Sequence, residues 1–162
     1  MKHFPRTLLA TAALSIFLVA ATPSSRASIQ KQFFQNGDLT DGNNYSPSGV
    51  PTSTTDILLT TPVLALTLNS GSIGAASLNQ LNNSAYTISN GSLTLVPQFG
   101  GGNSVSPSSA DAIYLGGTSS HLTIQATAGF AMASNLDVAQ SGAVLDLAGT
   151  VNVSNVSTVT KT

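Results

Sequence analysis

The chain has 162 residues, of which only 7% are charged, while its hydrophobic fraction of 41% is that of an ordinary globular protein. Disordered chains combine low hydrophobicity with high charge, so this composition argues against disorder. The absence of cysteine excludes a disulfide scaffold and thiolate metal sites. Past residue 27 the charged side chains are two lysines, Lys31 and Lys161, and six aspartates, a net charge of −4. Two lysines cannot supply the basic surface that nucleic-acid binding requires.

The segment 1–27 has the layout of a secretory signal peptide. Lys2 and Arg6 precede an uncharged apolar run over 7–21, and small residues follow, with cleavage sites after Ala21 and Ala27. The run is shorter than the ~20 residues that span a bilayer comfortably, which favours a cleaved signal over a retained anchor. The sequence therefore predicts a secreted or cell-surface protein with no membrane span after cleavage.

Residues 28–55 form a lead-in rich in Gly, Asn, Asp, Ser and Pro, with a few aromatic residues. Turn sequences dominate it, among them 36–38, 41–43 and 47–51. We expect an irregular segment with one short strand near 31–35.

From residue 56 to residue 162 the sequence consists of short units in which an apolar, a polar and an apolar residue alternate. Side chains alternate between the two faces of a strand, so each unit directs two apolar groups inward and one polar group outward. Gly, Asn and Ser separate the units, as tight turns require. No segment past residue 27 has a convincing helical pattern. The units begin at Leu66, Tyr86, Leu93, Leu122, Leu136, Leu145 and Val151.

The spacing of these units predicts an all-β fold, a right-handed parallel β-solenoid over 56–162. The units that begin at 66, 93, 122 and 145 recur at intervals in the twenties, and so do the apolar residues at 86, 113 and 136. Intervals of this length suit a solenoid whose turns each contribute two or three stacked strands. An antiparallel β-sandwich, whose strands also recur at short intervals, is the alternative.

Residues 33–59 resemble the opening of the bacterial autotransporter-associated β-strand repeat proteins and related exported β-helix proteins. The matching residues are Gly-Asp at 37–38, Asp-Gly-Asn-Asn-Tyr-Ser at 41–46, Gly-Val-Pro at 49–51 and Asp-Ile-Leu-Leu at 56–59. Tyr45 stands where these proteins usually have Trp, and the sequence shows neither a translocating β-barrel nor a Pro-Glu-Pro sorting motif. The resemblance covers about a sixth of the chain. It implies a surface-exposed passenger with a β-helix fold.

The strand-like pattern continues to residue 162 without a capping segment. An open terminal turn of a solenoid exposes unpaired backbone groups and apolar surface. We therefore expect either a truncated passenger or one that pairs with another copy.

Two carboxylates are candidates for catalysis. Asp137 and Asp146 occupy the central, outward positions of Leu-Asp-Val and Leu-Asp-Leu, and stacked strands would bring them together as the pair that glycoside hydrolysis needs. We favour the interpretation that both aspartates are solvated charges on an exposed strand face, where they discourage pairing with other strands. No catalytic residue is therefore assigned.

Three further features are interpreted as structural. His121, the only histidine past residue 27, begins a strand and has no Gly-x-Ser-x-Gly motif to accompany it. Residues 36–43 offer oxygen ligands, but their spacing is not that of known calcium-binding loops. We interpret this segment as a turn capped by its own side chains. Glycines 100–102 lack the lysine and helix that follow in a phosphate-binding loop. No metal or cofactor is predicted.

The sequence thus predicts an exported, surface-associated structural or adhesive protein without catalytic activity. Its partners would be glycans or other surface components, contacted weakly at many points through Ser, Thr and Asn side chains. Further copies of the chain are another expected partner, because low charge and β-branched strands favour self-association. The alternative function is that of a fragment of a polysaccharide-degrading enzyme that uses Asp137 and Asp146.

Overall fold

The computed structural model describes residues 29–35, 37–61, 63–97, 106, 110–131 and 133–161. The predicted signal peptide and glycines 100–102 lie outside these residues. The described residues are almost wholly strands and turns, with one short 3-10 helix, η1 (Gly42–Asn44). In this part of the chain no helix has the length and hydrophobicity needed to cross a bilayer.

The strands form three sheets, and all their paired strands are parallel except β1 and β2. Sheet A has the order β15 (Val156–Lys161), β12 (Ser134–Val138), β9 (Asp111–Leu115), β6 (Ser77–Gln80), β3 (Thr55–Leu59), β1 (Ile29–Phe33), β2 (Tyr45–Ser46). Sheet B has the order β13 (Val144–Leu147), β10 (His121–Ile124), β7 (Ala85–Ser89), β4 (Ala65–Thr67). Sheet C has the order β14 (Val151–Asn152), β11 (Thr127–Phe130), β8 (Ser92–Leu95), β5 (Ser72–Ala75).

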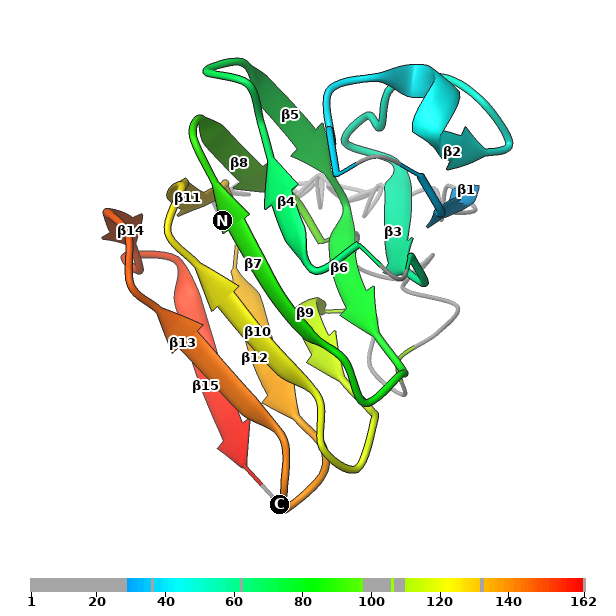
Figure 1. Cartoon of the computed structure of the whole chain (residues 1–162). Coiled ribbons are helices and arrows are strands. Elements are labelled where there is room, and N and C mark those ends of the chain that lie inside the picture. Colours follow the sequence, from blue (N-terminus) through cyan, green and yellow to red (C-terminus); the bar gives the residue numbers. More distant parts are fainter. Residues whose placement is uncertain are drawn as a thin grey trace, which may run out of the picture.

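From β3 to β15 the chain visits sheets A, B and C in a fixed rotation, so that each strand pairs with its equivalent one turn earlier (Figure 1). This winding is a β-solenoid of about five turns, as the alternating pattern predicts. The antiparallel sandwich is excluded, because strands adjacent in sequence lie in different sheets and do not form hairpins.

The interior consists of apolar rows that run along the solenoid. In-register pairing places equivalent residues of successive turns next to each other, so one apolar position per turn becomes a continuous row. In sheet A one row is Ile57, Leu78, Ile113, Leu136 and Val159. In sheet B one row is Leu66, Ile88, Ile124 and Leu147. In sheet C one row is Ile73, Leu93, Ala128 and Val151.

The apolar residues of the predicted units point inward in the first four turns and lose their cover in the last. The units that begin at 66, 86, 93, 122 and 136 have both apolar side chains buried. Leu145 and Leu147 are only partly buried, and Val153 is 54% exposed. The inward orientation is therefore confirmed for five of the seven units, and Val153 departs from it because no later turn is packed over it in the described residues.

The fold is the predicted solenoid, but only some of the strand partners that the spacing indicated pair with each other. Leu122 and Leu145 do pair, as do Ile113 and Leu136. Leu66 pairs with Ile88, whereas Leu93 belongs to another sheet. The turns are also unequal in length, since the step from position 78 to position 113 of the sheet A row contains the long connection between β8 and β9. Units on different sides of one turn look alike in sequence, so spacing alone could not distinguish them.

The lead-in folds back over the first turn. β1 pairs with β3, β2 closes the outer edge of β1, and a bridge joins Asp38 to Thr67 of sheet B (Figure 1). Phe33, Leu39 and Tyr45 are buried, and the Phe33 and Tyr45 rings meet edge to face with centroids 5.2 Å apart. This irregular segment therefore covers the apolar end of the solenoid at which the rows begin.

Leu122 provides a test of the interior rows, because it is fully buried between Tyr86 and Leu145 of the neighbouring turns. We expect Leu122→Ala to lower the free energy of unfolding by about 2–5 kcal/mol, through lost burial and an unfilled cavity. Thr123→Ala, one residue on and directed outward, should change it by less than about 0.5 kcal/mol. Urea denaturation followed by circular dichroism measures both, and equal effects of the two variants would contradict an inward Leu122.

Candidate functional site

The outer surfaces of sheets B and C carry ordered rows of small polar side chains. In sheet C the aligned residues Ser72, Ser92 and Thr127 form one row, and Thr94 and Asn152 belong to the next. In sheet B, Thr87 and Thr123 are direct neighbours on adjacent strands. All of these side chains are exposed or partly exposed. We call this set, Ser72, Thr87, Ser92, Thr94, Thr123, Thr127 and Asn152, the hydroxyl rows.

Regular spacing follows from the fold. Neighbouring parallel strands lie about 4.8 Å apart, so Ser72, Ser92 and Thr127 repeat a hydroxyl group at about that interval along the solenoid axis. The row of Thr94 has glycine at Gly74 and Gly129, so its polar side chains, Thr94 and Asn152, stand on every second strand. Such a surface can meet an extended ligand at several equivalent points.

Asp137 and Asp146 do not form the stacked pair that the sequence offered as a catalytic possibility. Asp137 lies on β12 of sheet A and aligns with Tyr114 and Thr160. Asp146 lies on β13 of sheet B and aligns with Thr123. Both point outward, and the outer surfaces of two sheets of one solenoid face different directions. The winding therefore separates these carboxylates.

Asp137 is nonetheless electrostatically perturbed. Burial raises the pKa of its carboxyl above the ordinary value, and the neighbouring charge of Asp111 raises it further. A raised pKa is what a general acid needs, but any half-buried carboxylate beside another shows it too. The carboxylate beside Asp137 is the buried Asp111 and not Asp146, so the perturbation does not come from the pair that the sequence offered.

Asp56 belongs to a buried polar group between β3 and β6. Ser77 Oγ donates to Asp56 Oδ1 at 2.6 Å, and Asn79 Nδ2 donates to Ser77 Oγ at 2.9 Å and to the Ile57 carbonyl at 3.2 Å. Asp56, Ser77 and Asn79 are at most 1% exposed, and Asp56 Oδ2 has no hydrogen-bond partner. A polysaccharide cannot reach a carboxylate buried this deeply. The bond from Ser77 to Asp56 links β3 and β6 of the first two turns.

His121 is the exposed first residue of β10 and aligns with Ala85 and Val144. The two residues beside it in the sheet therefore offer neither a carboxylate nor a hydroxyl. The residues aligned with His121 on the adjacent strands therefore supply no partner for a catalytic triad. Its position at the start of a strand agrees with the prediction from the sequence.

The acidic loop of the lead-in is held by its own hydrogen bonds. Asp38 Oδ1 accepts from the backbone N and the Oγ1 of Thr40, both at 2.8 Å, and Asp38 Oδ2 accepts from Asn69 Nδ2 at 2.6 Å. Asp41 Oδ1 accepts from Asn43 N at 2.9 Å. Burial acts to raise the pKa of Asp38, but the hydrogen bonds from Thr40, Asn69 and Asp41 outweigh it and lower the pKa.

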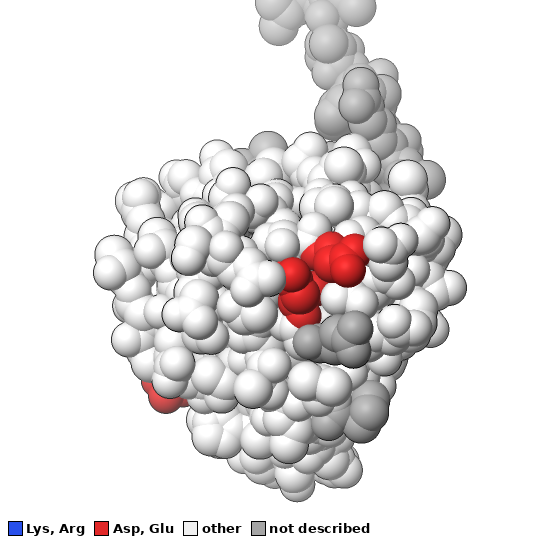
Figure 2. Space-filling view, turned by 45° about the horizontal axis from the view of Figure 1, so that its top comes forward, with Lys and Arg blue, Asp and Glu red and all other residues white. Residues whose placement is uncertain are grey.

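These bonds use the oxygens that a calcium ion would need, and no group of three His, Cys, Asp or Glu side chains in the described residues could hold a metal. Figure 2 shows one face of the molecule, with one group of acidic side chains near its centre, a separate acidic side chain at its lower left and no basic side chain in view. The other described residues on this face are uncharged.

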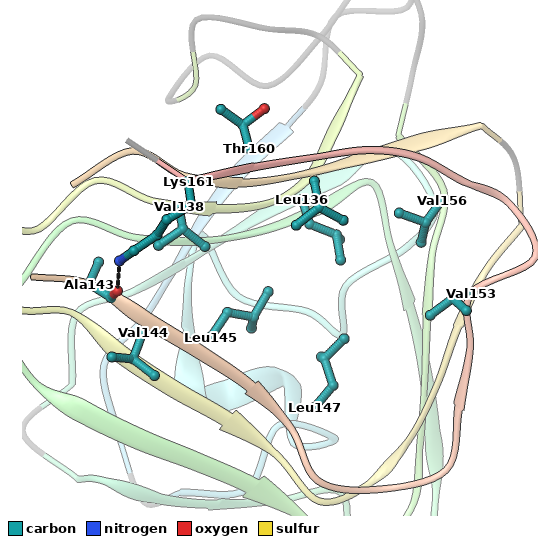
Figure 3. Close-up of a pocket in the computed structure, with 11 residues that line it drawn as sticks. Leu136, Val138, Ala143, Val144, Leu145, Leu147, Val153, Val156, Thr160 and Lys161 are labelled. Carbon is teal, nitrogen blue, oxygen red and sulfur yellow. Dashed lines mark hydrogen bonds between the residues drawn. The ribbon is translucent and has the colours of Figure 1, made fainter. Parts of the chain in front are cut away.

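An apolar hollow of about 640 Å³ opens at the last turn, between β12, β13 and β15. Figure 3 shows Leu136, Leu145, Leu147 and Val156 around it. Lys161 lies at its rim, where Nζ donates to the carbonyl oxygens of Gln140 at 3.2 Å, of Ser141 at 3.1 Å and of Ala143. The hollow is the interior of the solenoid at its last described turn.

Sequence reasoning missed Lys161 and Gln80, both of which lie in the inward row that also contains Leu59, Leu115 and Val138. Gln80 is fully buried, with Nε2 donating to the Ser84 carbonyl at 2.6 Å while Oε1 has no partner. Aligning the sequences of successive turns would have identified both, because Gln80 and Lys161 stand at a position where the neighbouring turns have an apolar residue.

Comparison of the chain with protein-family models, with curated proteins and with solved structures gave no match. The resemblance of residues 33–59 to autotransporter-associated repeats therefore stays a prediction.

Tyr45 links the acidic loop to the stability of the lead-in. Its hydroxyl donates to the Leu39 carbonyl at 2.8 Å, and burial, assisted by the charge of Asp38, raises its pKa well above the usual range. The unfolded chain ionises this phenol near pH 10 and the folded chain does not, so stability is fully present below about pH 10 and falls above it.

We therefore expect Tyr45→Phe to be about 1 kcal/mol less stable at neutral pH, where the Leu39 carbonyl loses its donor, and to lose less stability on going above pH 10. Urea denaturation at neutral pH and at a series of alkaline pH values measures both effects. The same alkaline loss in wild type and variant would contradict the assignment.

Proposed function

We propose that this chain is an exported, surface-associated structural or adhesive protein that has no catalytic activity of its own. Its hydroxyl rows would contact glycans or other surface components. The observation that carries this proposal is the regular, nearly uncharged array of Ser, Thr and Asn side chains on the outer surfaces of sheets B and C.

Each hydroxyl or amide contact is weak, because a hydrogen bond made on binding replaces one to water and contributes only about 0.5–1.5 kcal/mol. A repeated array binds more tightly than a single group, because contacts made along one extended ligand act as linked binding events. A rigid solenoid presents the groups without the cost of ordering them. Repetition and rigidity are the properties that an adhesive surface needs.

Export is part of the proposal and rests on the order of Lys2 and Arg6, the apolar run 7–21 and the small residues that follow. The small number of charges supports it as well, because the polar surface is built from groups that keep their character across the range of pH met outside a cell. Cleavage would leave a chain that begins at residue 22 or 28.

Thr→Val substitution tests the hydroxyl rows, because it removes the hydroxyl and keeps the β-branched shape that suits a strand. We expect the chain from residue 28 to co-sediment with insoluble polysaccharides of the cell surface, tested as peptidoglycan, cellulose and chitin. The triple variant Thr87→Val/Thr94→Val/Thr123→Val should bind at least about tenfold more weakly.

Thr52→Val/Thr118→Val, which changes two exposed threonines outside the rows, is the matched control and should bind like wild type. Failure of the wild-type chain to bind any of the three polysaccharides, or equal binding by the triple variant, would count against the proposal.

A polysaccharide-degrading enzyme is the second candidate. The raised pKa of Asp137 is the observation in its favour, and the position of Asp146 on another sheet counts against the pair that the sequence offered. We expect the secreted chain to be inactive on acidic polysaccharides such as pectate and alginate, with the same result for Asp146→Asn. Release of reducing ends or of unsaturated products by wild type, and its loss in the variant, would establish the enzyme instead.

A further inference from the structure

Five asparagines of the chain begin the tripeptide Asn-x-Ser, the acceptor sequence for N-linked glycans. They are Asn44, Asn82, Asn90, Asn152 and Asn155, and none of them has proline in the second position. The tripeptide arises often by chance in a chain rich in Asn and Ser, so the sequence does not choose among the five. A glycan acceptor must also present its side-chain nitrogen, Nδ2, to a transferase, and this depends on the fold.

Two of these amides are held inside the first turns. Asn44 is 2% exposed, and its Nδ2 donates to the Asp38 carbonyl at 2.8 Å. Asn82 Nδ2 donates to the hydroxyl oxygen of Tyr86 at 2.7 Å. A nitrogen that is engaged with a protein acceptor in this way is not available to a sugar donor, so neither residue is an acceptor in the folded chain.

Two further tripeptides are constrained by strand pairing. Asn155 Nδ2 donates to the Phe130 carbonyl at 2.6 Å. Asn90 lies in the left-handed region of the backbone, with φ of 56°, and the Ser92 N–H donates to the Gly71 carbonyl at 3.0 Å. The serine of that tripeptide is therefore bonded to the neighbouring turn and cannot bond back to its asparagine through the backbone.

The remaining tripeptide, Asn152-Val153-Ser154, folds back on itself at the surface. The backbone N–H and the hydroxyl of Ser154 both donate to Asn152 Oδ1, at 3.0 Å and 2.7 Å. A backbone N–H can only donate, so the atom that it meets is the amide oxygen. Asn152 is exposed, and within the described residues its Nδ2 has no hydrogen-bond partner. The serine hydroxyl thus lies beside an amide whose nitrogen is free.

Open surface surrounds the Asn152 side chain. Val151 packs against the core, so Asn152 points outward from β14. Its neighbour on β11 is Gly129, where an added Cβ would meet nothing within 4 Å. The site does not depend on the outer edge of β14, because a strand paired there would bond to the backbone and leave outward side chains exposed. The strand beside Asn152 therefore leaves room for a sugar ring.

We propose that Asn152 is a glycosylation site, at which Nδ2 accepts a sugar that is activated at its anomeric carbon by a phosphate leaving group. In the transfer, Nδ2 forms a bond to the anomeric carbon, and the bond from that carbon to the phosphate oxygen breaks. The leaving phosphate takes the bonding electron pair, and a proton of Nδ2 passes to a base of the transferase. The product is an N-linked glycan on the outer surface of sheet C.

This inference rests on export, the part of the proposed function that brings a chain to glycosylation enzymes, and not on the adhesive surface. Two kinds of donor share the chemistry, namely polyprenyl pyrophosphate oligosaccharides and nucleoside diphosphate sugars. Asn152 presents the same nitrogen to both, so the experiment has one arm for each donor.

The test presents the folded full chain, purified from a host without N-glycosylation, to a donor and its enzyme. One arm uses a polyprenyl pyrophosphate oligosaccharide with an oligosaccharyltransferase, and the other a nucleoside diphosphate sugar with a soluble N-glycosyltransferase. Mass spectrometry of the chain and its fragments should show one glycan, at Asn152, in at least one arm. Because donor and enzyme are supplied, this result is independent of export, which cleavage of the leader on secretion tests separately.

Asn152→Gln and Ser154→Ala should each abolish transfer, and circular dichroism should show that both variants remain folded. Ser154→Thr keeps the hydroxyl and should be glycosylated like wild type. Asn155→Gln, the matched change three residues on, should also keep the glycan, because its side chain is not the acceptor.

No transfer in either arm, or transfer to one of the other four asparagines in place of Asn152, would overturn the proposal. Transfer to a synthetic peptide of residues 149–157 but not to the folded chain would overturn it as well, because the fold would then hide the acceptor.

Discussion

In-register parallel pairing between equivalent strands of successive turns is the interaction on which this structure depends. It satisfies the backbone of each interior turn from both sides, and it also aligns apolar residues into rows that fill the interior. Pairing of β3, β6, β9 and β12 is what places four residues of the sheet A row next to one another, namely Ile57, Leu78, Ile113 and Leu136. The same pairing sets the spacing of the hydroxyl rows outside. One constraint thus produces a dry core and an ordered polar surface.

The same pairing leaves the strands at either end of the described solenoid with a neighbouring turn on one side only, so their outer edges and apolar side chains need another cover. The lead-in provides part of this cover at one end with β2 and the buried Phe33 and Tyr45. At the other end the rows run out into Leu145, Leu147 and Val159 around the hollow. The two ends of the described solenoid therefore differ in how far the interior is covered.

Polar residues inside the solenoid add specificity at the level of single turns. Gln80 stands in an apolar row between Leu59 and Leu115 and is satisfied through Nε2 alone. Asp56 accepts from Ser77 across adjacent strands and leaves one oxygen unpaired. Such groups lower stability relative to apolar residues. A pairing shifted by one residue would separate Asp56 from its donor Ser77, whereas Gln80 keeps Asn82 and Ser84, which belong to its own segment. The bond between Asp56 and Ser77 therefore favours the observed register of β3 and β6.

The alternation of apolar and polar residues by itself determined the strands and their inward side chains, because a period of two has one meaning wherever one face is buried. It left the solenoid and the antiparallel sandwich open, and the parallel pairing of the strands decided between them. Composition alone pointed to a surface of hydroxyl and amide groups. Local pattern could not determine which units align, since Leu66 and Leu93 look the same in sequence and lie in different sheets. Nor could it place Asp137 and Asp146, whose separation depends on the sheet to which each strand belongs. These were decided by the tertiary structure, because successive turns differ in length and only the pairing of the strands shows which units are equivalent.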